Sequence, residues 1–193
     1  MTYVVGGDYP AALLTGANSG GKTTLLEHIL SFCALDFIGL PLQKDCVVPK
    51  YSAIYYLAKN KGSANKGAFE TTLMQLAGVQ ITARTLVLAD ELESVTEPGV
   101  AAKVMASTLS YFVSHSVHCV FATHLGGILQ NYITTGMRID GIHAKGLSAS
   151  GKIEIDHNPR MNSLAASTPE LIIQKLANTH DDPFFHSLVK ALE

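Results

Sequence analysis

The segment Leu13–Ile29, LLTGANSGGKTTLLEHI, constrains the fold more than any other part of the chain. An apolar run ends at Gly16, and a run with helical periodicity begins near Lys22. The spacing of Gly16, Gly21, Lys22 and Thr23 fits G-x-x-x-x-G-K-[ST], in which successive backbone N–H groups surround phosphate oxygens. Glycine is needed wherever a side chain would block this close approach. The sequence therefore predicts a phosphate-binding loop between a strand and a helix.

Each polar position in this loop has a predicted role. The helix that begins near Lys22 would direct its positive dipole end at the phosphates, and the Lys22 ammonium would reach the β- and γ-phosphates. The Thr23 hydroxyl is expected to be a ligand to Mg²⁺. The predicted nucleotide contacts are Gly16, Ala17, Asn18, Ser19, Gly20, Gly21, Lys22, Thr23 and Thr24. The alternative is an ordinary glycine-rich turn, which the strand before the motif and the helix after it disfavour.

Two later segments carry the groups that hydrolysis would need. The run LVLADE (86–91) is a continuous apolar strand that ends in two carboxylates. We predict that Asp90 holds the Mg²⁺ shell and that Glu91 polarises the attacking water. His124 ends the next apolar strand and is predicted to sense the γ-phosphate or hold this water. The alternatives are that the carboxylates cap a turn and that His124 is an ordinary loop histidine.

Apolar runs alternate with segments of helical periodicity along the whole chain, which predicts an α/β fold with a mainly parallel central sheet flanked by helices. Strands are expected at 11–16, 51–58, 85–90, 118–124, 137–143 and 151–157. Helices are expected at 22–37, 69–79, 97–115, 169–178 and 183–193. We predict one domain over residues 1–193, in which residues 166–193 form a C-terminal helical appendage.

Composition limits the classes of function. The formal net charge of −2 leaves no overall basic surface for a nucleic-acid backbone. Cys33, Cys46 and Cys119 lack metal-ligand spacing and are expected to be buried small side chains. No secretory signal or membrane-spanning run is recognisable, which predicts a cytoplasmic protein without a membrane partner.

Three motifs together resemble the C-terminal ATPase domain of the MutS family of DNA mismatch-repair proteins, within the ABC-type group of P-loop NTPases. They are TGANSGGKTT (15–24), LVLADELESVTEPG (86–99) and VFATH (120–124). Ala17 replaces the proline that is usual in the family's loop. The DELESVTEPG segment is closer to the paralogues that act outside mismatch repair.

The resemblance implies a motor that binds ATP and Mg²⁺ and hydrolyses ATP as an ATP-bridged homodimer. It also implies DNA binding through regions of the parent protein that are not in this chain. Each site would be completed by a Ser-Thr-Phe segment of the partner, which GAFE matches only at Phe69, with Gly67 and Ala68 in the other positions. Ser63 or Lys66 could act in their place.

Two more contacts follow from the resemblance. Tyr3 and His157 occupy positions from which they could cover the adenine, the alternative being ordinary core or surface side chains. Residues 91–99 would lie beside the partner's site. The alternative is a plain connection in which Thr96 is the N-cap of the next helix.

The predicted function is ATP hydrolysis that drives a MutS-like DNA repair or recombination protein. A non-hydrolytic nucleotide-binding dimerisation module is the alternative, because the partner-facing segment departs from the family pattern. A small-molecule kinase would need an arginine-rich lid, and the sequence shows none.

Overall fold

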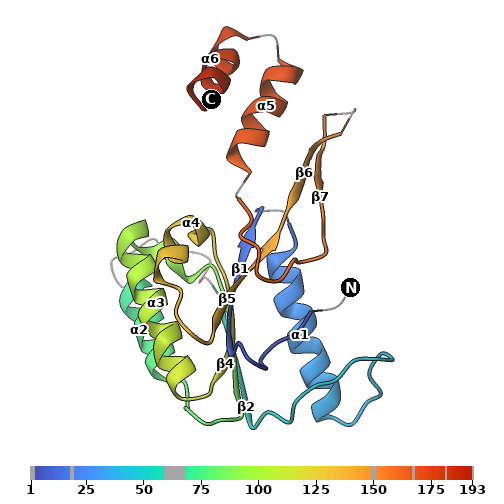
Figure 1. Ribbon diagram of the computed structural model, residues 1–193, viewed down its shortest axis with the longest axis vertical. Helices are drawn as coiled ribbons and strands as arrows, with labels where there is room; N and C mark the ends of the chain where they lie inside the picture. Colours follow the sequence, from blue (N-terminus) through green and yellow to red (C-terminus); the bar gives the residue numbers. More distant parts are fainter. Residues whose placement is uncertain are drawn as a thin grey trace.

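The computed structural model describes residues 3–17, 20–58, 68–148, 151–166, 168–180 and 182–192. A five-stranded sheet with the strand order β2-β3-β4-β1-β5 forms its centre, and each neighbouring pair is parallel (Figure 1). The strands are β1 (Ala11–Gly16), β2 (Ala53–Ala58), β3 (Thr85–Asp90), β4 (His118–Ala122) and β5 (Met137–Ile142). The predicted α/β fold of the P-loop NTPase type is confirmed.

Helices cover both faces of this sheet. They are α1 (Lys22–Phe37), α2 (Ala68–Ala77), α3 (Pro98–Ser114) and α4 (Gly126–Leu129). Helix α1 lies on one face, and α2, α3 and α4 lie on the other (Figure 1). Because successive strand side chains point to opposite faces, Leu14 packs with Leu26 of α1, whereas Leu13 packs in the core of Phe112 from α3. Burial on both faces explains why the strands are continuous apolar runs.

The strand order places the three motif-bearing segments at one edge of the sheet. Strand β4 pairs with β1 on one side and with β3 on the other. Ala122, the last residue of β4, lies opposite both Asp90 and Leu14. The carboxyl ends of these strands are therefore adjacent, and ligands of open α/β sheets bind at this edge.

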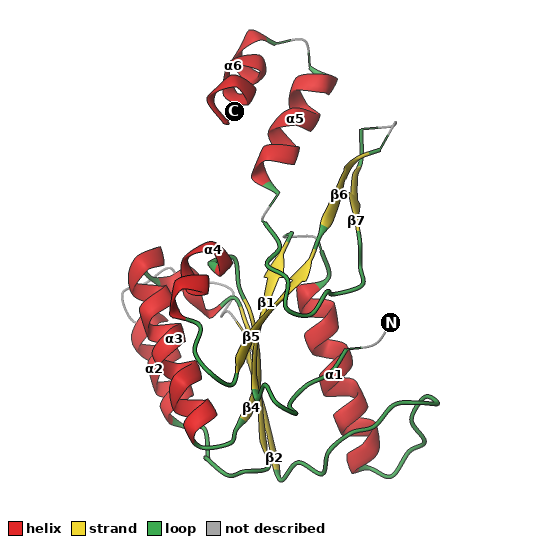
Figure 2. Ribbon diagram, viewed as in Figure 1, coloured by secondary structure: helices red, strands yellow, loops and turns green. Residues whose placement is uncertain are grey.

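The remaining elements follow the sheet along the chain. Strands β6 (Ala144–Leu147) and β7 (Ile153–Ile155) form an antiparallel pair, and η2 (Gln130–Tyr132) is a short 3₁₀ turn. Helices α5 (Pro169–Thr179) and α6 (Pro183–Leu192) lie beyond the carboxyl edge of the sheet (Figure 2). Both helices were expected, but the division into a domain and an appendage stays a prediction. Within the described part of the chain, no helix combines the length and apolar character that a bilayer span requires.

The start of α3 overturns one detail of the alternative interpretation of residues 91–99. Thr96 is not its N-cap, because the helix begins at Pro98 and Glu97 is the capping residue, in an extended conformation. A 3₁₀ turn, η1 (Leu92–Val95), comes between β3 and this helix. Proline is favoured in the first helical turn, where its missing N–H has no partner within the helix. The helix therefore starts at Pro98, one residue later than it would start with Thr96 as the N-cap.

A buried network ties the N-terminal segment to β5. Asp140 is fully buried, and its two carboxylate oxygens accept hydrogen bonds from Nε of Arg138 at 3.1 and 2.9 Å. The Tyr3 hydroxyl donates to Asp140 at 2.7 Å, and the backbone N–H of Asn162 donates to it at 3.1 Å. Arg138 also donates to the carbonyl of Val4. A buried carboxylate is tolerated in a fold when its oxygens are satisfied in this way.

Replacing Asp140 by alanine should be strongly destabilising, because it leaves the buried guanidinium of Arg138 without its counter-charge. We expect Asp140→Ala to lower the free energy of unfolding by about 3–5 kcal/mol, measured by urea denaturation. The exposed Asp8→Ala is the matched control and should change it by less than about 0.5 kcal/mol. Equal effects of the two substitutions would contradict this account of the network.

Candidate nucleotide-binding and hydrolysis site

The phosphate loop connects β1 to α1 through two residues that require glycine. Gly16 has a φ of +122°, and a Cβ there would lie 2.1 Å from the carbonyl oxygen of Ile142. Gly21 has a φ of +91° and caps α1, whose first backbone bond runs from Leu25 N to Gly21 O at 2.8 Å. The N–H groups of a first helical turn have no partner within the helix. The loop therefore directs backbone donors at the space where phosphates are predicted.

The other predicted loop residues fall on both sides of this turn. Ala17 is buried and accepts a hydrogen bond from Gly20 N at 2.9 Å. Thr23 and Thr24 are exposed in the first turn of α1. Asn18 and Ser19 lie outside the described residues.

Lys22 is the buried cation of the site. Only 3% of it is exposed, and its Nζ donates to the carbonyl oxygens of Gly16 at 2.8 Å and Ala17 at 3.1 Å. Burial lowers the pKa of Lys22 below its ordinary value, and the carboxylates of Glu91, Asp90 and Glu93 oppose this shift. An ammonium has three N–H donors, so two carbonyl contacts leave one for an anion in the loop.

A hydrogen bond joins the loop to the carboxylate strand. The Thr23 hydroxyl donates to Oδ2 of Asp90 at 2.7 Å. The other oxygen, Oδ1, is buried and has no hydrogen-bond partner among the described residues. Within the same residues, no three His, Cys, Asp or Glu side chains form a group able to hold a metal ion by themselves. One hydroxyl and one carboxylate suit Mg²⁺, which protein sites commonly hold with few side chains plus phosphate oxygens and waters.

Glu91 and His124 are brought together at the next position along the edge. Glu91 has a left-handed backbone with a φ of 52°, which is uncommon for a residue other than glycine. Its N–H donates to the carbonyl of Ala122 at 3.0 Å. The Glu91 carboxylate oxygen Oε1 is in hydrogen-bond contact with Nε2 of His124, and about a third of each side chain is exposed. A carboxylate and an imidazole in contact at a solvent-accessible edge can both take part in proton transfer.

Sequence reasoning missed one member of the site, Glu93. It lies in η1 and is only 8% exposed. Its Oε1 accepts hydrogen bonds from the Thr123 hydroxyl at 2.8 Å and from the His124 backbone N–H at 2.7 Å. Because glutamate is rarely buried without a partner, the pattern alone favours an exposed position. Only its place two residues after Glu91 could have drawn attention to it.

The two candidates for covering a base have different outcomes. Tyr3 is half-buried against the core, where its hydroxyl is bound to the buried Asp140 and its ring lies 5.5 Å from the Arg138 guanidinium. Burial raises the pKa of this hydroxyl above its usual value, and the charge of Asp140 adds to the shift. His157 lies against the phosphate loop, with Nδ1 3.3 Å from the Gly20 carbonyl oxygen. Its contact with a base stays a prediction.

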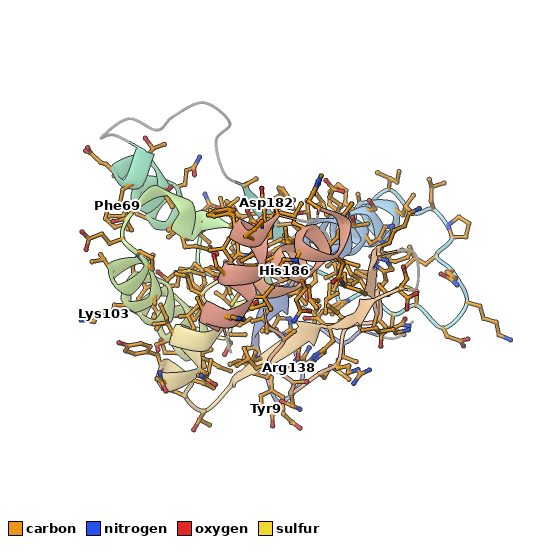
Figure 3. All side chains as sticks on the ribbon, turned by 90° about the horizontal axis from the view of Figure 1, so that it is seen from above. Tyr9, Phe69, Lys103, Arg138, Asp182 and His186 are labelled. Carbon is orange, nitrogen blue, oxygen red and sulfur yellow. The ribbon has the colours of Figure 1, made fainter. Side chains whose placement is uncertain are left out.

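The predicted partner-facing segment is described only in part. Phe69 lies in the first turn of α2 and is half-buried. Figure 3 looks down on α5 and α6 and shows Phe69 and Lys103 on the same flank of the molecule. Ser63, Lys66 and Gly67 lie outside the described residues, as does the side chain of Ala68.

Known proteins match this chain along most of its length. It is 37% identical over 188 residues, 92% of its length, to the DNA-binding protein MutS2 of Pyrococcus furiosus, of which it covers 33%. The chain belongs to the MutS family. It is 27% identical over 139 residues to the endonuclease MutS2 of Maridesulfovibrio salexigens, in a match that spans 68% of the chain and 18% of that protein.

Another relative is found in a plant. The mitochondrial DNA mismatch repair protein MSH1 of Arabidopsis thaliana is 30% identical over 128 residues, in a match covering 63% of the chain and 11% of that protein. The MutS-family chain thus spans about a third or less of the length of these relatives. No protein-family model matches it.

Replacement of Gly16 tests whether the loop needs its close approach to the Ile142 carbonyl. Gly16→Ala should lower the free energy of unfolding by more than about 1 kcal/mol, because the new methyl group meets the Ile142 carbonyl. Gly7→Ala is the matched control, because Gly7 also has a positive φ, +69°, but no heavy atom lies within 4 Å of the added Cβ. Losses of equal size in urea denaturation would show that the close contact does not matter.

Proposed function

We propose that this chain is the ATP-hydrolysing domain of a MutS-like DNA repair or recombination protein, working as an ATP-bridged homodimer with Mg²⁺. The 2.7 Å bond between Thr23 and Asp90 carries the proposal, because it joins the glycine loop to the carboxylate strand. Glu91 follows directly in sequence and contacts His124. A phosphate-binding loop, a metal ligand and a general base thus converge on one edge of the sheet.

Each group has a separate task in this proposal. The loop amides and Lys22 hold the β- and γ-phosphates, while Thr23 and Asp90 hold the metal. Bound Mg²⁺ would neutralise charge that develops on the phosphate oxygens. Glu91 accepts a proton from the attacking water, and His124 holds the Glu91 carboxylate and the water in position. The roughly one-third exposure of Glu91 and His124 allows water to reach them.

The proposed partners rest on the family relationship. Dimerisation around ATP would place the segment before α2 against the other subunit's site. DNA would be bound by parts of the parent protein outside these 193 residues, because the net charge of −2 favours no broad basic surface. The relative from Pyrococcus furiosus is named a DNA-binding protein, which supports this role. The cytoplasmic location stays a prediction.

The alternative function, a nucleotide-binding dimerisation module without turnover, draws support from Gly67 and Ala68, which replace the family's Ser-Thr. The two functions differ in how turnover per subunit depends on protein concentration. An ATP-bridged dimer should raise this rate as subunits associate. A rate that stays at background at every concentration would favour the module.

Lys22→Ala should strongly weaken nucleotide binding, because it removes the buried ammonium from the loop. We expect the Kd for ATP to rise at least about tenfold, the effect of losing roughly 1.4 kcal/mol of binding free energy. Isothermal titration calorimetry with ATP and Mg²⁺ measures this. Lys103→Ala removes an exposed lysine on α3 and should leave the Kd unchanged. Tight ATP binding by Lys22→Ala would contradict the assignment of the loop.

Glu91→Gln separates binding from hydrolysis. The amide keeps the size of the side chain but cannot accept the proton of water, so kcat should fall by about 10²–10⁴ while the Kd for ATP is retained. A phosphate-release assay gives kcat. Glu170→Gln changes an exposed glutamate on α5, outside the proposed site, and is the control. Full turnover by Glu91→Gln would remove Glu91 from the mechanism.

A further inference from the structure

Glu93 is a buried carboxylate that the proposed chemistry does not use. Its neighbour Leu92 is in the core, and the 3₁₀ turn η1 directs the Glu93 side chain toward the end of β4. A carboxylate in this position costs free energy unless its oxygens are hydrogen-bonded. Oε1 has two donors, the Thr123 hydroxyl at 2.8 Å and the His124 backbone N–H at 2.7 Å. Such charge-assisted bonds are stronger than those between neutral groups.

These bonds determine the shape of the turn that carries His124. The Thr123 side chain is fully buried, and its hydroxyl donates to Glu93 while accepting from the backbone N–H of Leu125 at 3.0 Å. The backbone on both sides of His124 is therefore tied to one carboxylate. From this position the His124 imidazole reaches the Glu91 carboxylate.

Glu93 also lines a small cavity. It has a volume of about 20 Å³, enough for one water molecule, and Glu93 lines it together with Phe69 and Leu73 of α2. The second carboxylate oxygen, Oε2, is buried and has no hydrogen-bond partner among the described residues. Glu93 thus contacts the His124 turn through one oxygen, and its side chain also lines a cavity beside α2.

We propose that Glu93 is a positioning residue for ATP hydrolysis, which holds the His124 backbone N–H so that the imidazole stays in contact with Glu91. This inference rests on the proposed function. Displacement of a catalytic group by about 1 Å can reduce the rate 10²-fold. A group that acts only by position should change kcat and leave the ground-state affinity for ATP nearly unaltered.

Steady-state kinetics give the first test. Glu93→Ala should lower kcat at least about tenfold and change the KM for ATP less than about twofold. Glu170→Ala changes an exposed glutamate on α5 that has no role in the proposed site, and it should change neither. Glu93→Gln keeps a carbonyl oxygen that can accept both hydrogen bonds, so it should recover most of the lost rate. A kcat as low for glutamine as for alanine would overturn the positioning role.

A double-mutant cycle separates positioning from general support of the fold. If Glu93 acts through His124, adding Glu93→Ala to His124→Ala should leave kcat at the value of His124→Ala alone. A merely structural role would give losses that multiply, and this result would overturn the inference. The cycle needs both single variants folded, which circular dichroism checks.

Nuclear magnetic resonance tests the same contact without requiring turnover. In the wild-type chain the His124 amide proton should resonate downfield, because it donates to a carboxylate. Glu93→Ala should move this resonance upfield and shift the imidazole signals of His124, whereas Glu170→Ala should do neither. If Glu93→Ala does not fold, Glu93→Gln should give a smaller change in the same direction. Unchanged His124 signals in a folded Glu93 variant would overturn the inference.

Kinetics and nuclear magnetic resonance together distinguish failure of the inference about Glu93 from failure of the proposed function. A wild-type chain that does not hydrolyse ATP at any concentration contradicts the proposed function, while the His124 resonances still report whether Glu93 holds this turn. Turnover in the wild type together with unchanged kcat in Glu93→Ala contradicts only the positioning role.

Discussion

Parallel pairing of β4 with β1 on one side and with β3 on the other is the constraint on which the site depends. It brings the start of α1 and the end of β3, which are 67 residues apart in sequence, within one hydrogen bond. A parallel strand needs a crossover before its neighbour, so the ends that share an edge come from separate parts of the chain. The three motifs therefore meet at this edge, although long stretches of sequence separate them.

The site concentrates charged groups, and hydroxyls and backbone groups hold them. Lys22 is bound by two loop carbonyls and lies in the field of three carboxylates. Asp90 accepts a hydrogen bond from a hydroxyl, and Glu93 accepts hydrogen bonds from a hydroxyl and a backbone N–H. Asp90 and Glu93 each retain one buried oxygen without a partner among the described residues. A buried polar atom without a hydrogen-bond partner costs free energy. Such atoms are common where a protein binds a ligand or catalyses a reaction.

The Glu91 backbone shows how the fold supports this arrangement. The strand ends at Asp90, and the left-handed conformation of the next residue turns the chain into η1. Strain of this sort persists only where surrounding contacts hold it. The bond from Glu91 N to the Ala122 carbonyl is one such contact, and Glu93 supplies others on the same strand end. The two glutamates thus both bind the end of β4 from the first part of one short turn.

The sequence by itself determined the fold class, the positions of most strands and helices, and the residues that the strand order brings to one edge. It could do so because apolar runs, glycine spacing and strand-ending carboxylates are local patterns with one dominant structural solution. Only the tertiary structure decided that Tyr3 is bound to a buried carboxylate, that Glu97 caps α3 and that Glu93 is buried behind His124. Each of these depends on which distant groups surround a side chain or on how a turn closes. The spacing of nearby residues in the sequence predicts neither the surroundings nor the turn.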